Sequence, residues 1–412
     1  MPKSILVRLV DNVGDLIIGI PVFRSVKTHY EKYRLIAMVR PEQRALLNGY
    51  VNGFIAPQSV NALQSYVGIY EYVINIAYGY PDGYRPDRLK RNRVNHIGIE
   101  DWNNGRHVCS NLITGVAQHN IPVSYYPPKL RLPSAAYTRA RDWFECNLPH
   151  ADDSLVVAVN AGSGFKYKRW PVDRFIQVCK WLIAEFNARI IVVSRDRRDY
   201  PARKLYNALP AYARNWLTNQ TLDTVAALLQ RVDLCIGNDS GIGHLAAAVN
   251  TPTVTVFGPT SPRLWKPTGS RSTVVFHREN DCCCGYEKAR VCRDKTCFSK
   301  ITERNFADAI LHSLNEHVGR DTKECLDRIT VADTIVMSRN RGGTLLVNTK
   351  SPHPMNINSG LPEIQRFLNL VSRVQSYSRI VRYDPRQRPL LHFLLLHRIL
   401  VSASTRRNNR WL

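Results

Sequence analysis

The sequence predicts an α/β protein made of two parallel β-sheets with covering helices, followed by a basic C-terminal extension. Short apolar segments alternate with amphipathic segments through both halves of the chain, which is typical of parallel strands joined by helices. A proline-containing stretch at residues 126–133 separates the two halves. We therefore expect two Rossmann-like domains that face a cleft, at residues 1–130 and 131–318, and an extension at 319–412.

The first domain opens with an apolar strand and an amphipathic helix, and similar segments recur along it. We expect strands at residues 5–10, 33–39 and 71–76 and helices at residues 17–30 and 107–119. Aromatic, glycine, proline and basic residues replace this pattern at residues 78–93, which predicts a loop.

The second domain repeats the alternation of strands and helices. In chain order we expect a helix at 135–146, a strand at 155–159, a helix at 172–186, a strand at 189–194, a helix at 221–230, strands at 234–237 and 253–257, and a helix at 301–314. Trp170 and Pro171 directly precede one of these helices. We expect both to be structural, as a core side chain and a first helical residue.

The chain carries a formal net charge of +24, from 57 Lys and Arg against 33 Asp and Glu. Such a charge attracts polyanions, namely nucleic acid, anionic lipid, a phosphorylated glycolipid or a nucleotide sugar. Nucleic acid is not the partner we expect, because the sequence has no basic helix with interleaved aromatics, zinc-finger spacing or RNA-binding sheet motif. No apolar stretch has the length of a membrane span and none resembles a signal peptide, so we expect a cytoplasmic protein.

The extension holds much of the positive charge. Residues 366–412 contain ten arginines and one acid, Asp384, so they contribute +9 of the total. An apolar run at residues 390–401 is flanked by arginines and is too short to cross a bilayer. Two interpretations stay open, an interfacial anchor on the inner face of the cytoplasmic membrane and a helix packed on the other domains.

The ten cysteines fall into two groups. Five are scattered in predicted helices and strands, and we expect them to be reduced core residues: Cys109, Cys146, Cys179, Cys235 and Cys325. The other five crowd one segment: Cys282, Cys283, Cys284, Cys292 and Cys297. We expect reduced loop cysteines here and no cofactor, because the spacing matches no standard zinc pattern. A structural metal held by Cys282, Cys284, Cys292 and Cys297 is the alternative.

The most informative segment lies at residues 233–269. A buried apolar strand leads into the polar run Gly237 to His244, and a helix of small residues follows. This is a strand, a tight loop and a helix N-terminus, a geometry on which anionic ligands sit. The next strand ends in a second loop, Gly258-Pro259-Thr260-Ser261-Pro262, and two adjacent strand-end loops predict a ligand crevice.

At these residues the chain resembles glycosyltransferase family 9, the bacterial lipopolysaccharide heptosyltransferases. The family's Asp-Thr-Gly-x-x-His signature is matched from Asp239 to His244, with Ser240 in place of the usual threonine, and its Gly-Pro-Thr-x-Pro block follows. Its Lys-x-Trp-Pro block is matched from Lys168 to Pro171, and its Gly-Asp loop at Gly14 and Asp15. The resemblance covers roughly residues 4 to 316.

The resemblance implies a GT-B fold and an inverting, metal-independent transfer of a heptose, from ADP-heptose as the expected donor, to a lipopolysaccharide core or related glycan. The implied partners are the nucleotide sugar and a phosphorylated glycolipid acceptor. The alternatives are another donor, a protein acceptor, or a homologue that binds glycan without catalysis.

Sugar transfer from a nucleoside diphosphate needs a base for the acceptor and donors for the departing diphosphate. Asp15 aligns with the family's catalytic base, although an aspartate there can also cap the helix that follows. Lys168 aligns with its phosphate-binding lysine, and Ser163 and Gly164 would contact the same phosphates.

The resemblance assigns the remaining donor contacts to the second domain. Asp239 is expected to hold hydroxyls of the donor sugar, while Ser240 and Gly241 present amides to the diphosphate. His244 falls one turn into the helix and can donate to a phosphate oxygen. Two further candidates align near the nucleoside-binding loop: Gln220 and Thr221.

The chain departs from the family pattern at two places. Leu9 occupies a position where members often carry a basic residue, and Arg8 is shifted by one, which turns its side chain to the other face of the strand. The family's Gly-Gly turn is replaced by residues 194–198, which include three arginines. That change alters the rim of the expected donor pocket.

Overall fold

The computed structural model describes residues 3–76, 94–97, 106–149, 154–277, 289, 291–292, 296–321, 335–339 and 345–349. Several predictions lie outside these residues. They are the loop at 78–93, the cysteines at 282–284 and 325, and the apolar run at 390–401. Across the described part of the chain, no helix combines the length and the hydropathy that a membrane crossing needs.

The first sheet has five parallel strands in the order β3-β2-β1-β4-β5. The strands are β1 (Ser4–Arg8), β2 (Arg34–Met38), β3 (Gly53–Ile55), β4 (Tyr72–Ile76) and β5 (Val94–Ile97). The helical segments are α1 (Val13–His29), η1 (Pro41–Leu47), η2 (Val60–Tyr66) and α3 (Val108–Ala117).

The second sheet has six parallel strands in the order β11-β10-β9-β6-β7-β8. The strands are β6 (Val156–Asn160), β7 (Arg189–Val193), β8 (Arg214–Leu217), β9 (Leu234–Asn238), β10 (Thr253–Phe257) and β11 (Ser272–Phe276). The helices are α4 (Ser134–Asn147), η5 (Lys166–Lys168), α5 (Val172–Phe186), α6 (Tyr200–Ala208), η6 (Ala211–Ala213), α7 (Leu222–Leu229), α8 (Gly241–Ala248), α9 (Pro262–Trp265), α11 (Thr296–Ser299) and α12 (Glu303–Asp321).

Both sheets follow the Rossmann strand order. Each grows outward in one direction from its first strand and then reverses, so that β1 lies beside β4 and β6 lies beside β9. In sheets of this kind ligands bind outside the carboxyl ends of the strands at the point of reversal. Asp15 follows β1, Lys168 follows β6 and Asp239 follows β9, so the topology places these three expected site residues at the two points of reversal. Gln220 and Thr221 follow the edge strand β8 instead.

Local sequence explains why the second sheet forms. β6, β9 and β10 are buried along their whole length, as expected for parallel strands covered on both faces. α5 buries a stripe with helical spacing that includes Phe175, Cys179, Leu182 and Phe186. The helix ends at Asn187, whose φ of 50° closes it in the left-handed conformation.

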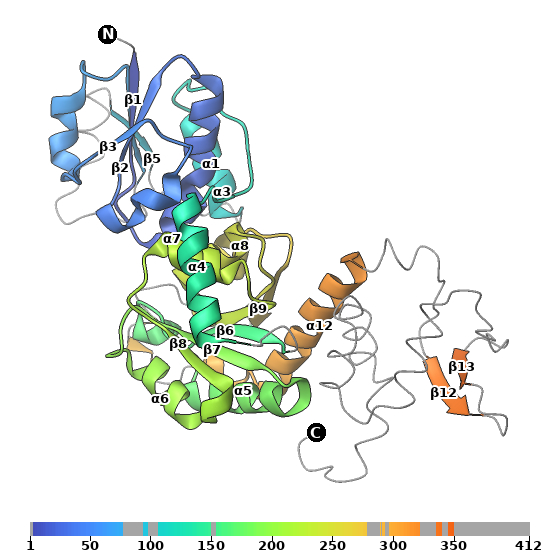
Figure 1. The fold of residues 1–412 in the computed structure, drawn as a ribbon. Helices are drawn as coiled ribbons and strands as arrows, with labels where there is room; N and C mark the ends of the chain where they lie inside the picture. The colour runs from blue at the N-terminus through green and yellow to red at the C-terminus, as the bar shows by residue number, and fades with distance from the viewer. Residues whose placement is uncertain are drawn as a thin grey trace.

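The two sheets are joined by an apolar layer. α4, α7 and α8 lie between the sheets (Figure 1), and their buried side chains belong to the same cluster as those of α1 and α3. The main-chain N–H of Leu130 donates to the carbonyl of Ala248 at 3.1 Å, which ties the inter-sheet segment to α8. This layer holds the start of α1 against the start of α8.

Some element boundaries differ from the prediction. α1 begins at Val13, four residues earlier than expected, so Asp15 lies in its first turn and Asn12 is the N-cap. Pro171 is the N-cap of α5 and not its first helical residue. The prediction for Cys146 was wrong, because its side chain is exposed. α4 buries Ala136, Ala140 and Phe144 at intervals of four, and Cys146 lies off that face.

The edge strands and the pair of strands within the extension were not predicted. β8 and β11 lie at the two edges of the second sheet and are only partly buried. β3 and β5 are the corresponding edges of the first sheet. In the extension, α12 continues to Asp321, and β12 (Ile335–Arg339) pairs antiparallel with β13 (Leu345–Thr349).

Candidate functional site

Three loops that follow parallel strands meet at one edge of the second sheet. Lys168 ends η5 after β6, Asp239 follows β9, and Thr260 follows β10. β9 lies between β6 and β10, and the carboxyl ends of parallel strands lie at the same edge of a sheet. The sheet order therefore brings together side chains that are far apart in the sequence.

Lys168 and Asp239 form a buried ion pair. Lys168 Nζ donates to Asp239 Oδ2 at 2.8 Å, and the two side chains are 11% and 6% exposed. A pair this buried survives only because each charge offsets the lost hydration of the other. The pair is a charged centre at the sheet edge, and an anion can join it through the lysine.

Thr260 is a site residue that sequence reasoning missed. Its Oγ1 donates to the same oxygen, Asp239 Oδ2, at 2.6 Å, and Thr260 is 3% exposed. A signal was present in the sequence, because Thr260 lies in the loop after the strand that follows Asp239. The loop was expected to border a ligand, but nothing local indicated that its threonine would bind Asp239.

The loop after β6 is held against Asp239 by polar contacts. Ser163 Oγ donates to the main-chain carbonyl of Asp239 at 3.3 Å. Arg169 in turn donates from Nε and Nη2 to the Ser163 carbonyl, at 3.1 and 2.7 Å. Gly164 is exposed, and a Cβ built on it would have no described atom within 4 Å. The loop therefore presents open main chain beside the ion pair.

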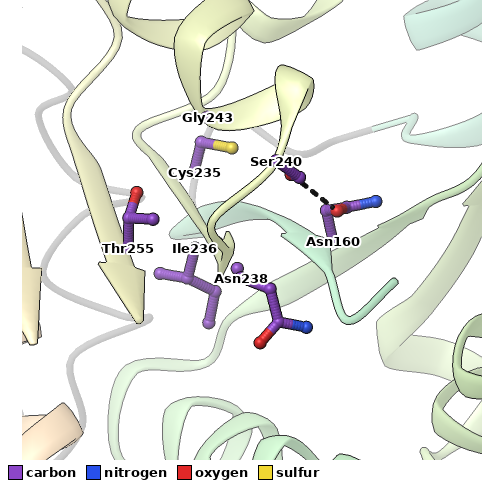
Figure 2. Close-up of a pocket in the computed structure, with 8 residues that line it drawn as sticks. Asn160, Cys235, Ile236, Asn238, Ser240, Gly243 and Thr255 are labelled. Carbon is purple, nitrogen blue, oxygen red and sulfur yellow. Dashed lines mark hydrogen bonds between the residues drawn. The ribbon is translucent and has the colours of Figure 1, made fainter. Parts of the chain in front are cut away.

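Two buried asparagines cross-link the loops after β6 and β9. Asn160 Oδ1 accepts from Ser240 Oγ at 3.0 Å, which Figure 2 shows. Asn238 Oδ1 accepts from the Trp170 main-chain N–H at 2.9 Å, and its Nδ2 donates to the Ala161 carbonyl at 2.8 Å. Each loop is thus fixed by a side chain from the other strand.

A small pocket lies behind these contacts, between β9, β10 and the start of α8 (Figure 2). It has no space that a water molecule could occupy, whereas small-molecule sites enclose roughly 300 Å³ or more. Its lining includes Asn160, Cys235, Ser240 and Thr255. We regard it as a gap beneath the loops and not as the donor site.

The start of α8 has main-chain groups suited to an anion. Ser240 is the N-cap, but its hydroxyl donates to Asn160 and does not accept from the helix. The first amides of a helix have no intrahelical acceptor, and the helix dipole places partial positive charge there. Ser240 and Gly241 therefore lie where the sequence predicted anion-binding amides.

His244 is buried one turn into α8. It is 5% exposed, and its Nδ1 has no hydrogen-bond partner among the residues that the structure describes. Burial lowers the pKa of His244 to about 4, although the charge of Asp239 opposes this shift, and His107 and Lys168 lower the pKa further. His244 is therefore neutral at physiological pH and can contact a ligand as a neutral donor or acceptor.

Asp15 approaches the site from α1. Its Oδ2 accepts from the Asn12 main-chain N–H at 3.0 Å, so the side chain also helps to cap the helix. Burial raises the pKa of Asp15 to about 6, with a further increase from the charge of Asp11, against the opposing effects of Asn12 and Lys168. The influence of Lys168 means that the carboxylate and the ion pair share one electrostatic environment.

Glycines allow α1 and α8 to meet. A Cβ on Gly14 would lie 3.2 Å from His244 Cδ2 and 3.4 Å from Gly241 Cα, and a Cβ on Gly241 would lie 3.0 Å from the Gly14 nitrogen. The contact brings Asp15, the residue after Gly14, to the start of α8. Both helix N-termini therefore point their amides toward one region.

Other predicted residues lie apart from this cluster. Gln220 and Thr221 are exposed after the edge strand β8, and in the described structure Thr221 Oγ1 bonds Thr224 Oγ1 at 2.8 Å. Arg8 is buried and donates to Asn75 Oδ1 at 3.0 Å, while Leu9 is fully buried. The arginine shift therefore turns that charge toward β4.

The metal alternative is only partly covered by the structure. Cys297 is buried and Cys292 half-buried, while Cys282 and Cys284 lie outside the described residues. In the part of the chain that is described, no group of three or more His, Cys, Asp or Glu side chains is arranged to hold a metal ion. The four-cysteine site stays a prediction.

The chain matches known sequences in the region of these motifs. The model of glycosyltransferase family 9 (heptosyltransferase) matches residues 98–294. Lipopolysaccharide heptosyltransferase 2 of Escherichia coli is 27% identical over 179 residues, 40% of this chain and 51% of the relative. Lipooligosaccharide heptosyltransferase 2 of Haemophilus influenzae is 30% identical over 113 residues, 26% of this chain and 32% of the relative. The chain thus spans about half or less of the length of these curated relatives. The resemblance to family 9 is confirmed by the family match.

Solved structures confirm the fold class. The structure of Escherichia coli ADP-heptose lipopolysaccharide heptosyltransferase II has a TM-score of 0.60 and 18% identity, over 76% of this chain and 99% of that chain. The GT-B architecture of two Rossmann-like sheets is therefore the fold of this protein.

Proposed function

We propose that this chain, in which residues 98–294 match glycosyltransferase family 9, is an inverting glycosyltransferase. It moves a heptose from a nucleotide sugar, with ADP-heptose as the proposed donor, to a lipopolysaccharide core or related glycan. The observation that carries the proposal is the buried pair of Lys168 and Asp239, placed at the strand ends beside the start of α8.

The site has the groups that the departure of a diphosphate requires. Lys168 supplies a cation, and the amides at the start of α8 supply partial positive charge. Together they offset the charge that grows on the leaving oxygen, so we propose that transfer needs no metal ion. His244 is neutral, so it would contribute a hydrogen bond and not a second charge.

Asp15 is the proposed base. Its pKa of about 6 leaves it largely ionised at neutral pH and still basic enough to accept a proton. In the proposed step the acceptor hydroxyl loses its proton to Asp15 as its oxygen bonds the anomeric carbon. The bond from that carbon to the diphosphate breaks with its electrons on the diphosphate. One displacement of this kind inverts the anomeric configuration.

We propose a phosphorylated glycolipid as the acceptor, at the inner face of the cytoplasmic membrane. The support is the net charge of +24, which favours contact with anionic lipid. Flotation with anionic and neutral liposomes tests this, using the full chain and a chain truncated after Gly319. Binding to anionic liposomes that depends on the extension would support it, whereas equal recovery with neutral liposomes would contradict it.

Calorimetric titration with ADP-heptose, ADP, UDP and GDP tests the central proposal, with Lys168→Ala and Asp239→Ala as comparison variants. Selective adenine-nucleotide binding that both variants weaken is the expected result. Preference for UDP or GDP would retain the enzyme class and replace the donor. Binding of none of the four would favour a homologue that binds glycan without catalysis.

A further inference from the structure

The two carboxylate oxygens of Asp239 have different surroundings. Oδ2 accepts from both Lys168 Nζ, at 2.8 Å, and Thr260 Oγ1, at 2.6 Å. No hydrogen bond from the described residues reaches Oδ1. The carboxylate is therefore held at one oxygen by two donors, and the other oxygen keeps its capacity to accept.

Ligand binding would remove one of these two donors. In the proposed function Lys168 binds the diphosphate of the donor, so its ammonium must share or leave Asp239. Asp239 is 6% exposed, and a buried carboxylate without donors carries a large desolvation cost. Thr260 remains bonded to Asp239, because its hydroxyl is on the loop after β10 and does not move with Lys168, which is on the loop after β6.

We propose that Thr260 is a positioning residue that orients Asp239 toward the donor sugar. By holding Oδ2, it keeps Oδ1 directed at a sugar hydroxyl after Lys168 has turned to the phosphates. The proposal rests on the proposed function and adds a specificity determinant to it. Thr260 should control how strongly the site prefers a nucleotide sugar to the nucleoside diphosphate alone.

The loop that carries Thr260 is rigid enough for this role. A Cβ on Gly258 would lie 2.3 Å from Phe298 Cζ, so the Phe298 ring packs directly on the loop backbone. Phe298 is itself buried, and Pro259 restricts the backbone between Gly258 and Thr260. The threonine hydroxyl is therefore fixed by packing and does not depend on the ion pair for its position.

The structure contains a matched control for Thr260. Thr251 has the same exposed fraction, 3%, and its hydroxyl also makes a buried hydrogen bond, to the Leu229 carbonyl at 2.7 Å. Thr251 precedes β10, whereas Thr260 follows it, so the two threonines lie near opposite ends of one strand. Thr251→Val makes the same chemical change as Thr260→Val, away from Asp239.

The test measures the affinity for ADP-heptose and for ADP separately, by calorimetry on the full chain. Thr260→Val should lower the preference for ADP-heptose over ADP by about 10-fold, the size expected for a lost hydrogen bond to a charged group. Both ligands lose the donor to Asp239, but only ADP-heptose also loses the orientation of the carboxylate. Thr260→Ser should restore the preference because it keeps the hydroxyl. Thr251→Val should leave both affinities unchanged.

A double-mutant cycle separates positioning from general stability. In an Asp239→Asn background, Thr260→Val should cause no further loss of preference, because the threonine acts through the carboxylate. Equal weakening of both ligands by Thr260→Val, or a Thr260→Ser variant that stays unselective, would overturn the inference alone. If the wild-type chain binds ADP, and binds ADP-heptose no more tightly than ADP, then the role of Asp239 and this inference fail together. If it binds neither ligand, the proposed function fails as well.

Discussion

Replacing Lys168 by methionine should destabilise the fold, because it leaves the Asp239 carboxylate buried without its cation. At 2.8 Å and an effective dielectric constant of about 20, the two charges attract by about 6 kcal/mol. Removing the lysine also removes the cost of burying its ammonium, and the hydrogen bond from Thr260 still stabilises the carboxylate. We therefore expect a loss of about 3 kcal/mol, at the lower end of the range for broken buried pairs.

Urea denaturation of the full chain, followed by tryptophan fluorescence, measures this loss. Trp170 is buried and its main-chain N–H donates to Asn238, so its emission reports on the site. Combining Lys168→Met with Asp239→Asn should cost at least about 2 kcal/mol less than the sum of the single changes.

Lys204→Met is the matched control. Lys204 pairs with Asp173 at the same distance of 2.8 Å, but those side chains are 37% and 69% exposed. Solvent screens such a pair, so its loss should leave the unfolding curve unchanged. A cost below about 1 kcal/mol for Lys168→Met, or strict additivity with Asp239→Asn, would refute the reasoning from burial.

Four further predictions concern neighbouring residues. The transfer rate should fall as the pH drops through about 6, where Asp15 gains its proton. Asp11→Asn should move this fall to lower pH, because the charge of Asp11 raises the pKa of Asp15. A pH–rate profile that is identical in the wild type and in Asp11→Asn would contradict the assignment of Asp15 as the base. Because the pKa of Asp15 is raised in the folded state, its contribution to stability is largest below about pH 4 and is lost as the pH rises through about 6. In urea denaturation, Asp15→Asn should therefore be more stable than the wild type at pH 8 but not at pH 4. Gly258→Ala should cost about 1–3 kcal/mol because its Cβ would overlap the Phe298 ring, and Phe298→Leu should recover part of that loss; no recovery would place the strain elsewhere. Asn238→Leu should lower the free energy of unfolding by at least about 2 kcal/mol in the same assay, because it leaves the Trp170 main-chain N–H and the Ala161 carbonyl without this partner. An unchanged unfolding midpoint would show that the loops do not need this side chain.

Local pattern was enough to predict most of the central elements. The predicted bounds of α5 and β10 agree with the structure, because a helical apolar stripe and an unbroken apolar run are properties of neighbouring residues. A loop and a helix were also predicted after β9, and α8 begins at Gly241, within the polar run and earlier than the small residues that indicated the helix. The start of α1 was misplaced because Asn12 and Asp15 cap it together, and either residue alone reads as an N-cap.

Edge strands were beyond local pattern for a physical reason. β8 and β11 each pair with one neighbour and bury only part of their surface, so selection for apolar residues is weak along them. Such strands become recognisable only when the rest of the sheet is present to pair with them.

By itself the sequence determined which loops hold the candidate site residues, because glycine, hydroxyl and charged residues after an apolar strand have a local structural meaning. Only the tertiary structure decided the partners within those loops. Lys168 lies 71 positions from Asp239, and Thr260 lies 21 positions away, yet both reach one oxygen. The order of the strands in the sheet brings these residues into contact. That order follows from the packing of the whole chain and not from any short segment of it.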